Sequence, residues 1–387
     1  MYRIDDKQRR LRLGRRHLLA PAARASSVVA VADAVVALHA TDAATVFLSA
    51  CARLTAPDIG AVEQALYEDV SLVRLLAMRN TLFTMSRAVA VSVDASNARR
   101  VAAKERQRLL KHLREDGNGL DERWLAEVEQ QTIAALAPRG RATGSELSAA
   151  VPALRTKITV FPGTKQETLQ GVASRVIRVL AAEGRIRRDR PRGTWTSSQF
   201  RWTASEPWPA QDPAQARVEV ARRWLHSYGP ATEGDLKWWT GWGVRETREA
   251  LTAIAPEEVL LDSGAVGWVA PGDLAAEPPS APWAALLPGL DPSAMGWADR
   301  AFQLSSNHRA ALFDRAGNIG PTVWCDGEIV GGWAQRADGE LVWRLLSDVG
   351  REASELIASE ASRMSAWMGD VRITPRFRTP LERELTA

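Results

Sequence analysis

The chain has 387 residues, of which 45% are hydrophobic and 25% are charged, and its formal net charge is +4. This length predicts about two to four domains whose cores need no disulfide or metal for stability. The two cysteines, Cys51 and Cys325, lie far apart without a metal-binding motif, and no apolar run approaches the ~20 residues of a membrane span. We therefore expect a cytoplasmic protein with reduced thiols, and not a secreted or membrane protein.

Residues 8–95 are predicted to be mostly helical. Apolar side chains recur at helical spacing in three stretches, 28–38, 43–54 and 64–76. An alternating run at 81–85 then indicates a strand. Three helices and a strand are typical of a small helical DNA-binding domain.

Residues 120–205 give this order more clearly. The expected elements are a helix over 121–137, a short helix capped by Thr143 and Glu146, a helix over 169–183, and a hairpin with strands at 185–188 and 194–196. This is the order of a winged-helix unit, in which the third helix and the hairpin, or wing, both face nucleic acid.

Arginines gather on the predicted third helix and wing of this segment. The run contains Arg175, Arg178, Arg185, Arg187, Arg188, Arg190, Arg192 and Arg201. Their place on elements that would touch phosphate predicts nucleic-acid binding. Of the 15 tryptophans, Trp195 and Trp202 flank the wing and are the candidates to contact DNA, whereas most others are expected in the core. A second basic run at 99–114 fits a solvated helix face equally well.

The third segment, 213–272, repeats the pattern. It predicts helices over 214–226, from 232 onward and over 244–254, and a hairpin over 259–269, before a proline-rich linker at 271–282. The rest of the chain predicts an antiparallel sheet or small barrel from short runs at 309–313, 321–324, 328–334 and 341–346, then a helix over 352–368 and a last strand at 371–373.

Most catalytic motifs are missing from the sequence. There is no phosphate-binding glycine loop and no zinc motif, and the five histidines are scattered, so no cofactor or metal is expected. No carboxylate cluster suits a magnesium-dependent nuclease. Without an obvious dimerisation helix, we expect a monomer.

One polar stretch does stand out, at the junction of two predicted helices. His39, Thr41 and Asp42 follow one apolar helix and precede another. Asp42 or Thr41 could be the N-cap of the second helix, which is the structural alternative to a catalytic role.

The stretch Leu38-His39-Ala40-Thr41-Asp42, with Arg53-Leu54 downstream, resembles the first-domain motif of the AlkZ/YcaQ family of bacterial DNA glycosylases. Four C-terminal stretches resemble the same family: 287–292, 317–324, 331–333 and 375–377. The resemblance implies an α+β chain of three tandem winged-helix units, with a C-terminal antiparallel, barrel-like β domain. The expected boundaries are 1–115, with the catalytic motif, 116–210, with the basic wing, 211–280 and 281–387.

The resemblance also implies the activity: a monofunctional glycosylase that releases N7- or N3-alkylated purines from double-stranded DNA at the nucleoid. Its substrates would include bulky adducts and cross-links made by antibiotics, as self-resistance to a toxin would require. The family motif is usually Gln, an apolar residue, then Gln or Asp, and here His39, Ala40 and Thr41 stand at those positions.

On this resemblance the catalytic residues are His39, Thr41 and Asp42. His39 could orient a water through a neutral ring nitrogen, or take its proton, since its reference pKa is ~6.5. The residues expected to bind DNA are Arg53, Arg79, Arg185, Arg187, Arg188, Arg190, Arg192, Trp195, Arg201 and Trp202. The alternative is a non-catalytic winged-helix DNA-binding protein or transcriptional regulator.

Overall fold

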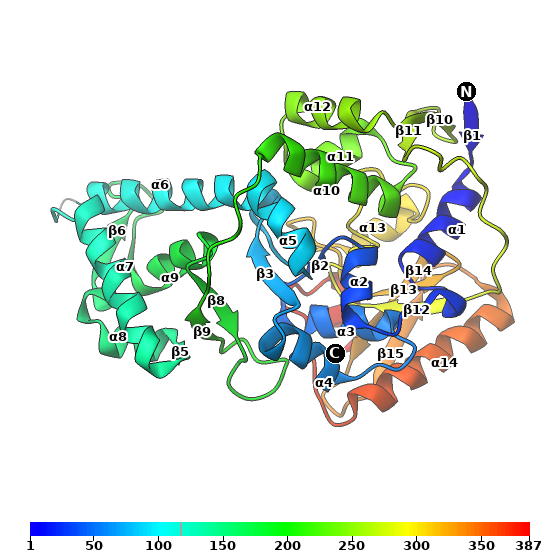
Figure 1. Ribbon diagram of the computed structural model, residues 1–387. Coiled ribbons are helices and arrows are strands. Elements are labelled where there is room, and N and C mark those ends of the chain that lie inside the picture. The colour runs from blue at the N-terminus through cyan, green and yellow to red at the C-terminus, as the bar shows by residue number, and fades with distance from the viewer. Residues whose placement is uncertain (117) are drawn as a thin grey trace.

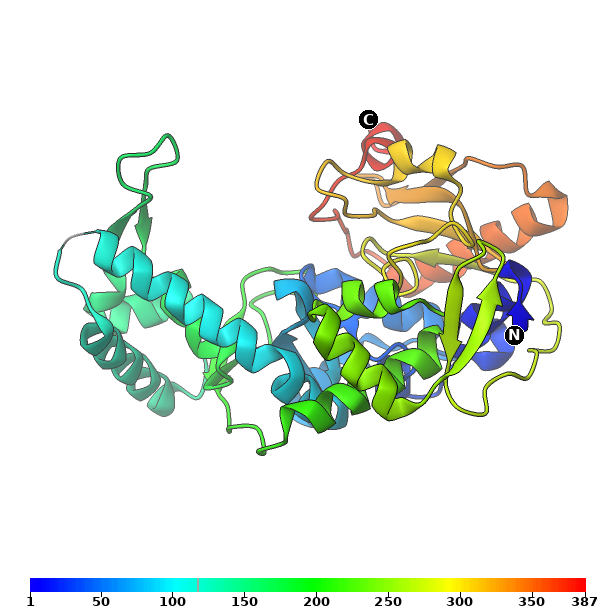
Figure 2. The ribbon, with the colours of Figure 1, turned by 90° about the horizontal axis from the view of Figure 1, so that it is seen from above.

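The computed structural model describes residues 1–116 and 118–387 and has a mixed α+β fold with several small sheets (Figure 1). A smaller lobe, which contains α7 (Glu122–Leu136), is joined by the long helix α6 (Arg99–Glu115) to a larger body that holds both termini. Figure 2, the view from above, shows α6 running from the body into this lobe.

The first segment of the body surrounds a three-stranded antiparallel sheet with strand order β2-β4-β3. Its elements are α2 (Val28–Ala34), β2 (Leu38–His39), α3 (Ala43–Arg53), α4 (Ile59–Glu63), the π-turn η2 (Gln64–Glu68), β3 (Leu72–Leu76), the 3-10 turn η3 (Met78–Asn80), β4 (Leu82–Ser86), α5 (Arg87–Val93) and the π-turn η4 (Asp94–Ala98). The predictions of α3 and β4 are confirmed.

Two predicted helices of this segment are shorter than expected. The helix expected over 28–38 ends at Ala34, because Val36 has a positive φ of 61° and the chain then enters β2. The helix expected over 64–76 gives only one turn, because Val70 also has a positive φ and residues from Leu72 pair with β4 instead. These corrections place His39 on a strand.

The smaller lobe has its own hydrophobic core, formed by residues between Leu109 and Trp202. Its elements after α7 are the 3-10 turn η5 (Ala137–Arg139), β5 (Ala142–Thr143), α8 (Gly144–Ala150), the 3-10 turn η6 (Pro152–Arg155), β6 (Lys157–Val160), β7 (Thr168–Gly171), α9 (Ala173–Ala182), β8 (Ile186–Asp189) and β9 (Arg201–Ala204). The sheet order is β5-β9-β8, and β6 pairs with β7 in a separate hairpin that the sequence analysis missed.

The second strand of the wing lies later in the chain than predicted. It is β9, whereas the expected strand at 194–196 belongs to a long loop between β8 and β9. Trp195 in this loop is 4% exposed and packs against Phe47 of α3 and Trp367, with ring centres 4.9 and 5.6 Å away. Burial of this side chain draws the loop onto the larger body.

The third segment contains α10 (Pro213–Tyr228), α11 (Glu233–Thr240), α12 (Val244–Ile254), β10 (Glu257–Leu261) and β11 (Val266–Val269). Its three predicted helices and hairpin are confirmed. The N-terminal strand β1 (Tyr2–Ile4) pairs in parallel with β10. Helix α1 (Asp6–Arg16) follows, and its Arg12 and Arg16 form ion pairs with Asp273 of the linker.

The C-terminal sheet is open, with strand order β12-β13-β14-β15, so the expectation of a barrel is wrong. Its elements are β12 (Ala284–Leu287), the 3-10 turn η7 (Ser306–His308), α13 (Arg309–Leu312), β13 (Thr322–Cys325), β14 (Glu328–Gln335), β15 (Leu341–Leu345), α14 (Gly350–Met368) and α15 (Pro380–Leu385). Apolar residues of α14 pack on one face and those of α13 and α15 on the other. Both faces are thereby buried without closure of the sheet. The run at 309–313 is helical, and 371–373 forms no strand.

Candidate functional site

His39 lies at the end of β2, directly before the turn into α3. Its backbone pairs with that of Phe83 on β4, and the two rings meet edge to face with centres 5.2 Å apart. The His39 side chain is 5% exposed. Neither ring nitrogen has a hydrogen-bonding partner among the described residues, and Nδ1 is fully buried. A buried polar atom without a partner is unusual in a folded protein, and it marks His39 as a candidate for contact with a substrate or water.

Burial lowers the pKa of His39 to about 3, and the positive charge of Arg79 lowers this pKa further. Loss of hydration penalises the charged imidazolium, so the ring is neutral at physiological pH. Of the two roles expected for His39, the neutral ring favours orientation of a water over uptake of its proton. A neutral ring still has one nitrogen that accepts a hydrogen bond and one that donates.

Arg79 lies in the tight turn between β3 and β4. Arg79 and Asn80 both have positive φ, 51° and 57°, as a two-residue hairpin turn requires. The guanidinium carbon of Arg79 lies 3.9 Å from the ring centre of Trp238 on α11, and that of Arg300 lies 4.9 Å from the same ring. Neither arginine forms an ion pair in the described part of the chain. Burial lowers the pKa of each to about 10, which leaves both cationic at neutral pH.

Asp42 is the N-cap of α3, as the structural alternative predicted. One oxygen of its carboxylate accepts the backbone N–H of Ala44 at 3.1 Å, and the other accepts that of Arg376 at 3.0 Å. Its catalytic role stays a prediction beside this cap. Thr41 is half-buried, and within residues 1–116 and 118–387 its hydroxyl forms no hydrogen bond.

Arg53 does not reach DNA, and this prediction is wrong. The side chain is completely buried, and its guanidinium binds both carboxylate oxygens of Asp291, at 2.7 and 2.9 Å. The remaining N–H groups donate to the carbonyls of His17 and Ser49 and to the hydroxyl of Ser293. With every donor used inside the core, Arg53 joins α3 to the C-terminal domain.

Several predicted wing residues are also occupied within the protein. Arg185 pairs with Glu129 at 2.7 Å, Arg190 with Glu63 and Glu68 of the larger body, and Arg192 with Glu146. Arg201 donates to the carbonyls of Arg190 and Pro191. Trp195 is buried, so its predicted contact with DNA is wrong. The wing therefore docks on the body, and DNA contact by its four arginines would have to compete with these bonds.

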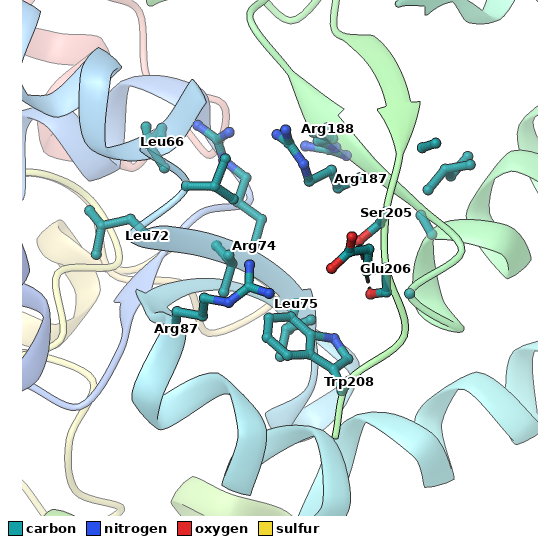
Figure 3. Close-up of a pocket in the computed structure, with 16 residues that line it drawn as sticks. Leu66, Leu72, Arg74, Leu75, Arg87, Arg187, Arg188, Ser205, Glu206 and Trp208 are labelled. Carbon is teal, nitrogen blue, oxygen red and sulfur yellow. Dashed lines mark hydrogen bonds between the residues drawn. The ribbon is translucent and has the colours of Figure 1, made fainter. Parts of the chain in front are cut away.

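Arg187, Arg188 and Trp202 are half-buried and lie at a cleft between the lobe and the body. Figure 3 shows a cavity of about 230 Å³ there, with Arg187 and Arg188 from β8 on one side and Arg74 and Arg87 on the other. Arg188 and Trp202 also line an adjoining cavity of about 650 Å³ beside α9. Arg74 and Arg87 were not predicted from the sequence, although a lone arginine among the apolar residues of 72–76 is a signal for such a site.

The residues around His39 and the arginines of the cleft lie on opposite faces of the sheet β2-β4-β3. Arg74 pairs with Thr84, and its neighbour Leu75 pairs with Phe83, which in turn pairs with His39. Because successive residues of a strand point to opposite faces, Arg74 faces the cleft while His39 faces α11 and Arg79.

Comparison with known proteins agrees with this architecture. The family model described as DNA glycosylase AlkZ-like matches residues 32–367. Among solved structures, the DNA glycosylase AlkZ of Streptomyces sahachiroi superposes with a TM-score of 0.71 at 23% sequence identity, covering 94% of this chain and 97% of that chain. At this identity the likeness shows the fold. No curated protein matches the chain significantly. Because the family match extends over most of the chain and includes His39, Thr41 and Asp42, the predicted resemblance is confirmed, and the chain belongs to the AlkZ-like DNA glycosylase family.

Proposed function

We propose that the chain hydrolyses the N-glycosidic bond of alkylated purines in double-stranded DNA, N7-alkylguanine above all, and leaves an abasic site. Family membership supports the reaction class. The observation that carries the proposal is the neutral, buried and unpartnered ring of His39, at the position where the family has a catalytic glutamine.

The chemistry of the substrate explains why a neutral side chain suffices. Alkylation at N7 gives the base a formal positive charge, so the base leaves without a general acid. The enzyme has to hold a water and stabilise the oxocarbenium-like sugar as it forms. An acceptor nitrogen of His39 would orient the water as a glutamine carbonyl does, with the free hydroxyl of Thr41 as a second partner. Asp42 would offset the positive charge of the sugar, and we rank the three in this order.

Arg79 is assigned to a phosphate and not to the reacting atoms. Its positive charge would oppose a cationic sugar, whereas a guanidinium stacked on Trp238 without a carboxylate partner suits a DNA phosphate. This role is consistent with its place on the hairpin that follows the His39 strand.

We also infer that three segments are winged-helix units within the boundaries 1–115, 116–210 and 211–280. Two of them have the order helix, strand, helix, helix, hairpin, with the third strand between the first and second, as in β2-β4-β3 and β5-β9-β8. In the third, an isolated bridge from Ala231 to Trp268 takes the place of the first strand. In such units a helix and a hairpin approach DNA, which supports a curved duplex-binding surface.

A gel assay for abasic sites in duplex DNA with one N7-methylguanine tests the proposal. We expect His39→Ala to slow base release by about 10²–10⁴-fold, the usual cost of losing a water-orienting group. His39→Gln, which restores the family residue, should retain activity, and Thr41→Ala should have a smaller effect. His226→Ala is the matched control, since this histidine is exposed on α10.

The departures at positions 39 and 41 favour one alternative, a relative that binds alkylated DNA without cutting it. Selective binding of alkylated duplex by the wild-type protein with no abasic product, together with base release by His39→Gln, would establish that alternative. Equal rates for the wild type and His39→Ala would contradict the catalytic assignment.

A further inference from the structure

The cleft between the smaller lobe and the body concentrates positive charge. The cavity in Figure 3 is lined by Arg74 of β3, Arg87 at the start of α5, and Arg187 and Arg188 of β8. Glu206 is the single carboxylate in its lining. The two sides of the cavity come from different parts of the molecule, so the charges of one face those of the other.

These four arginines differ from the other arginines of the wing. Arg185, Arg190 and Arg192 each pair with a carboxylate, whereas none of the four forms an ion pair in the described part of the chain. Arg74 donates to the hydroxyl of Tyr67 at 3.1 Å, and its second terminal nitrogen has no partner. One terminal nitrogen of Arg187 is likewise buried without a partner.

The cluster is electrostatically unfavourable as it stands. Burial lowers the pKa of Arg188 to about 10, and the charges of Arg74, Arg376 and Arg178 lower it further. Burial also lowers the pKa of Arg187, and the charges of Arg87 and Arg74 lower it further against the opposing effect of Asp189. Buried cations without an anionic partner are costly, and an anion in the cavity would supply the opposite charge and the missing acceptors.

We propose that Arg74, Arg187 and Arg188 form one phosphodiester-binding pocket across the junction of lobe and body, and that a single backbone phosphate of bound DNA occupies it. The proposal rests on the proposed function in taking DNA as the partner, and it adds a specific site away from His39. A guanidinium group binds phosphate oxygens through paired N–H donors, so several arginines can bind one phosphate at the same time.

The surroundings of the pocket favour a phosphate within a DNA strand over a free phosphate ion. The adjoining cavity of about 650 Å³ also includes these three arginines and continues along α9 past Ser145, Ser174 and Trp202. If a phosphate of a DNA strand binds the arginines, this cavity has room for the neighbouring nucleotide. The two serine hydroxyls could donate hydrogen bonds to that nucleotide, and the tryptophan ring could stack on its base. Because the pocket has one wall in each part, the bound phosphate would hold lobe and body together.

Removal of a cleft arginine should stabilise the free protein and weaken its binding to DNA. An arginine with a purely structural role would not give these two opposite effects. We expect Arg187→Gln to raise the melting temperature of the free protein, because it relieves repulsion, and to weaken binding of an undamaged duplex. The slope of log affinity against log salt should fall by no more than about 0.9, the contribution of one phosphate, because the three arginines share it. The double variant Arg187→Gln/Arg188→Gln should weaken binding further, but its total loss of slope should stay within the same limit.

Arg123→Gln is the control, because this exposed arginine of the same lobe has Glu127 of its own helix as its one ion-pair partner within residues 1–116 and 118–387. A lower melting temperature with unchanged binding would overturn the proposal, as would a slope loss near 1.8 in the double variant. Stabilisation of the wild type by inorganic phosphate, with no effect of the variants on DNA, would assign the pocket to a free anion and also overturn it. Since undamaged DNA is the probe, the result is independent of whether the protein releases a base.

Discussion

At the scale of single residues, His39 is kept neutral by burial and not by a hydrogen-bonding partner. Its pKa of about 3 lies well below the reference value of ~6.5, so the fraction of neutral ring hardly changes between pH 5 and 9. A general base with that pKa would be weak, which leaves orientation of water as its contribution.

This predicts the pH dependence of the reaction. We expect the single-turnover rate of base release to show no inflection near pH 6.5, in the wild type or in His39→Gln. Protonation of His39 would impair the wild type only as the pH approaches 3. The measurement is the rate between pH 5 and 9 on an N7-methylguanine duplex. An inflection near pH 6.5 that His39→Gln abolishes would show that the ring titrates freely when DNA is bound.

A substitution of Asp42 can separate its role as a helix cap from a role of its negative charge in the reaction. Asparagine caps helices nearly as well as aspartate, but its amide nitrogen cannot accept the second N–H, from Arg376. We expect Asp42→Asn to lower the free energy of unfolding by about 1 kcal/mol, the scale of one hydrogen bond. The rate of base release should fall less than in His39→Ala. A rate loss as large as that of His39→Ala, in a variant of nearly normal stability, would place the carboxylate charge in the reaction.

The sequence predicted the family better than it predicted the surroundings of single side chains. The motif around His39 indicated the family, and the N-cap alternative was available for Asp42. The burial of Arg53 was not predictable, because its partner Asp291 lies 238 residues away in the sequence. In the sequence, an arginine beside a motif gives the same signal whether it binds a DNA phosphate or a carboxylate far along the chain.

At the scale of elements, the loop between β8 and β9 joins the two parts of the molecule. Trp195 inserts between Phe47 and Trp367, while Arg190 pairs with Glu63 and Glu68. This loop and helix α6 both connect the lobe to the body.

Truncation of this tryptophan should therefore be costly. We expect Trp195→Ala to lower the free energy of unfolding by about 3–5 kcal/mol, the usual range for a large buried aromatic side chain. Urea denaturation followed by circular dichroism measures the change. Trp343→Ala is the control, since that side chain is 36% exposed on β15 and should cost far less. Similar losses in both variants would mean that the loop is not held by its tryptophan.

Long helices with regular spacing were predictable from the sequence, as α3, α7 and α12 show. Short strands were not. The apolar residues of Leu72–Leu76 fit either a helix or a strand, and only pairing with β4 decides between them. Likewise the position of β9 depends on where Trp195 is buried, which no local pattern records.

At the scale of the whole molecule, the net charge of +4 is small, but the arginines fall into two groups. Some are paired with a carboxylate of the protein and others are not. Many arginines are neutralised within the protein, and Arg185, Arg190 and Arg192 are examples. Arginines without a carboxylate partner in the described part of the chain include Arg74, Arg79, Arg187, Arg188 and Arg300. These line the cleft or surround Trp238, on the two faces of the sheet that carries His39.

This distribution sets the expected mode of DNA binding. If the three cleft arginines share one phosphate and Arg79 and Arg300 contact one or two more, binding of undamaged duplex should show a slope of log affinity against log salt of about −2 to −3. Contacts to the backbone carry no sequence information, so selection from random DNA should return no motif. Fluorescence anisotropy at a series of salt concentrations gives the slope. A slope near −6 would mean that the bonds of the four wing arginines within the protein break and that these arginines contact about four more phosphates, at about 0.9 each. Recovery of one palindromic sequence would instead favour a regulator with paired half-sites.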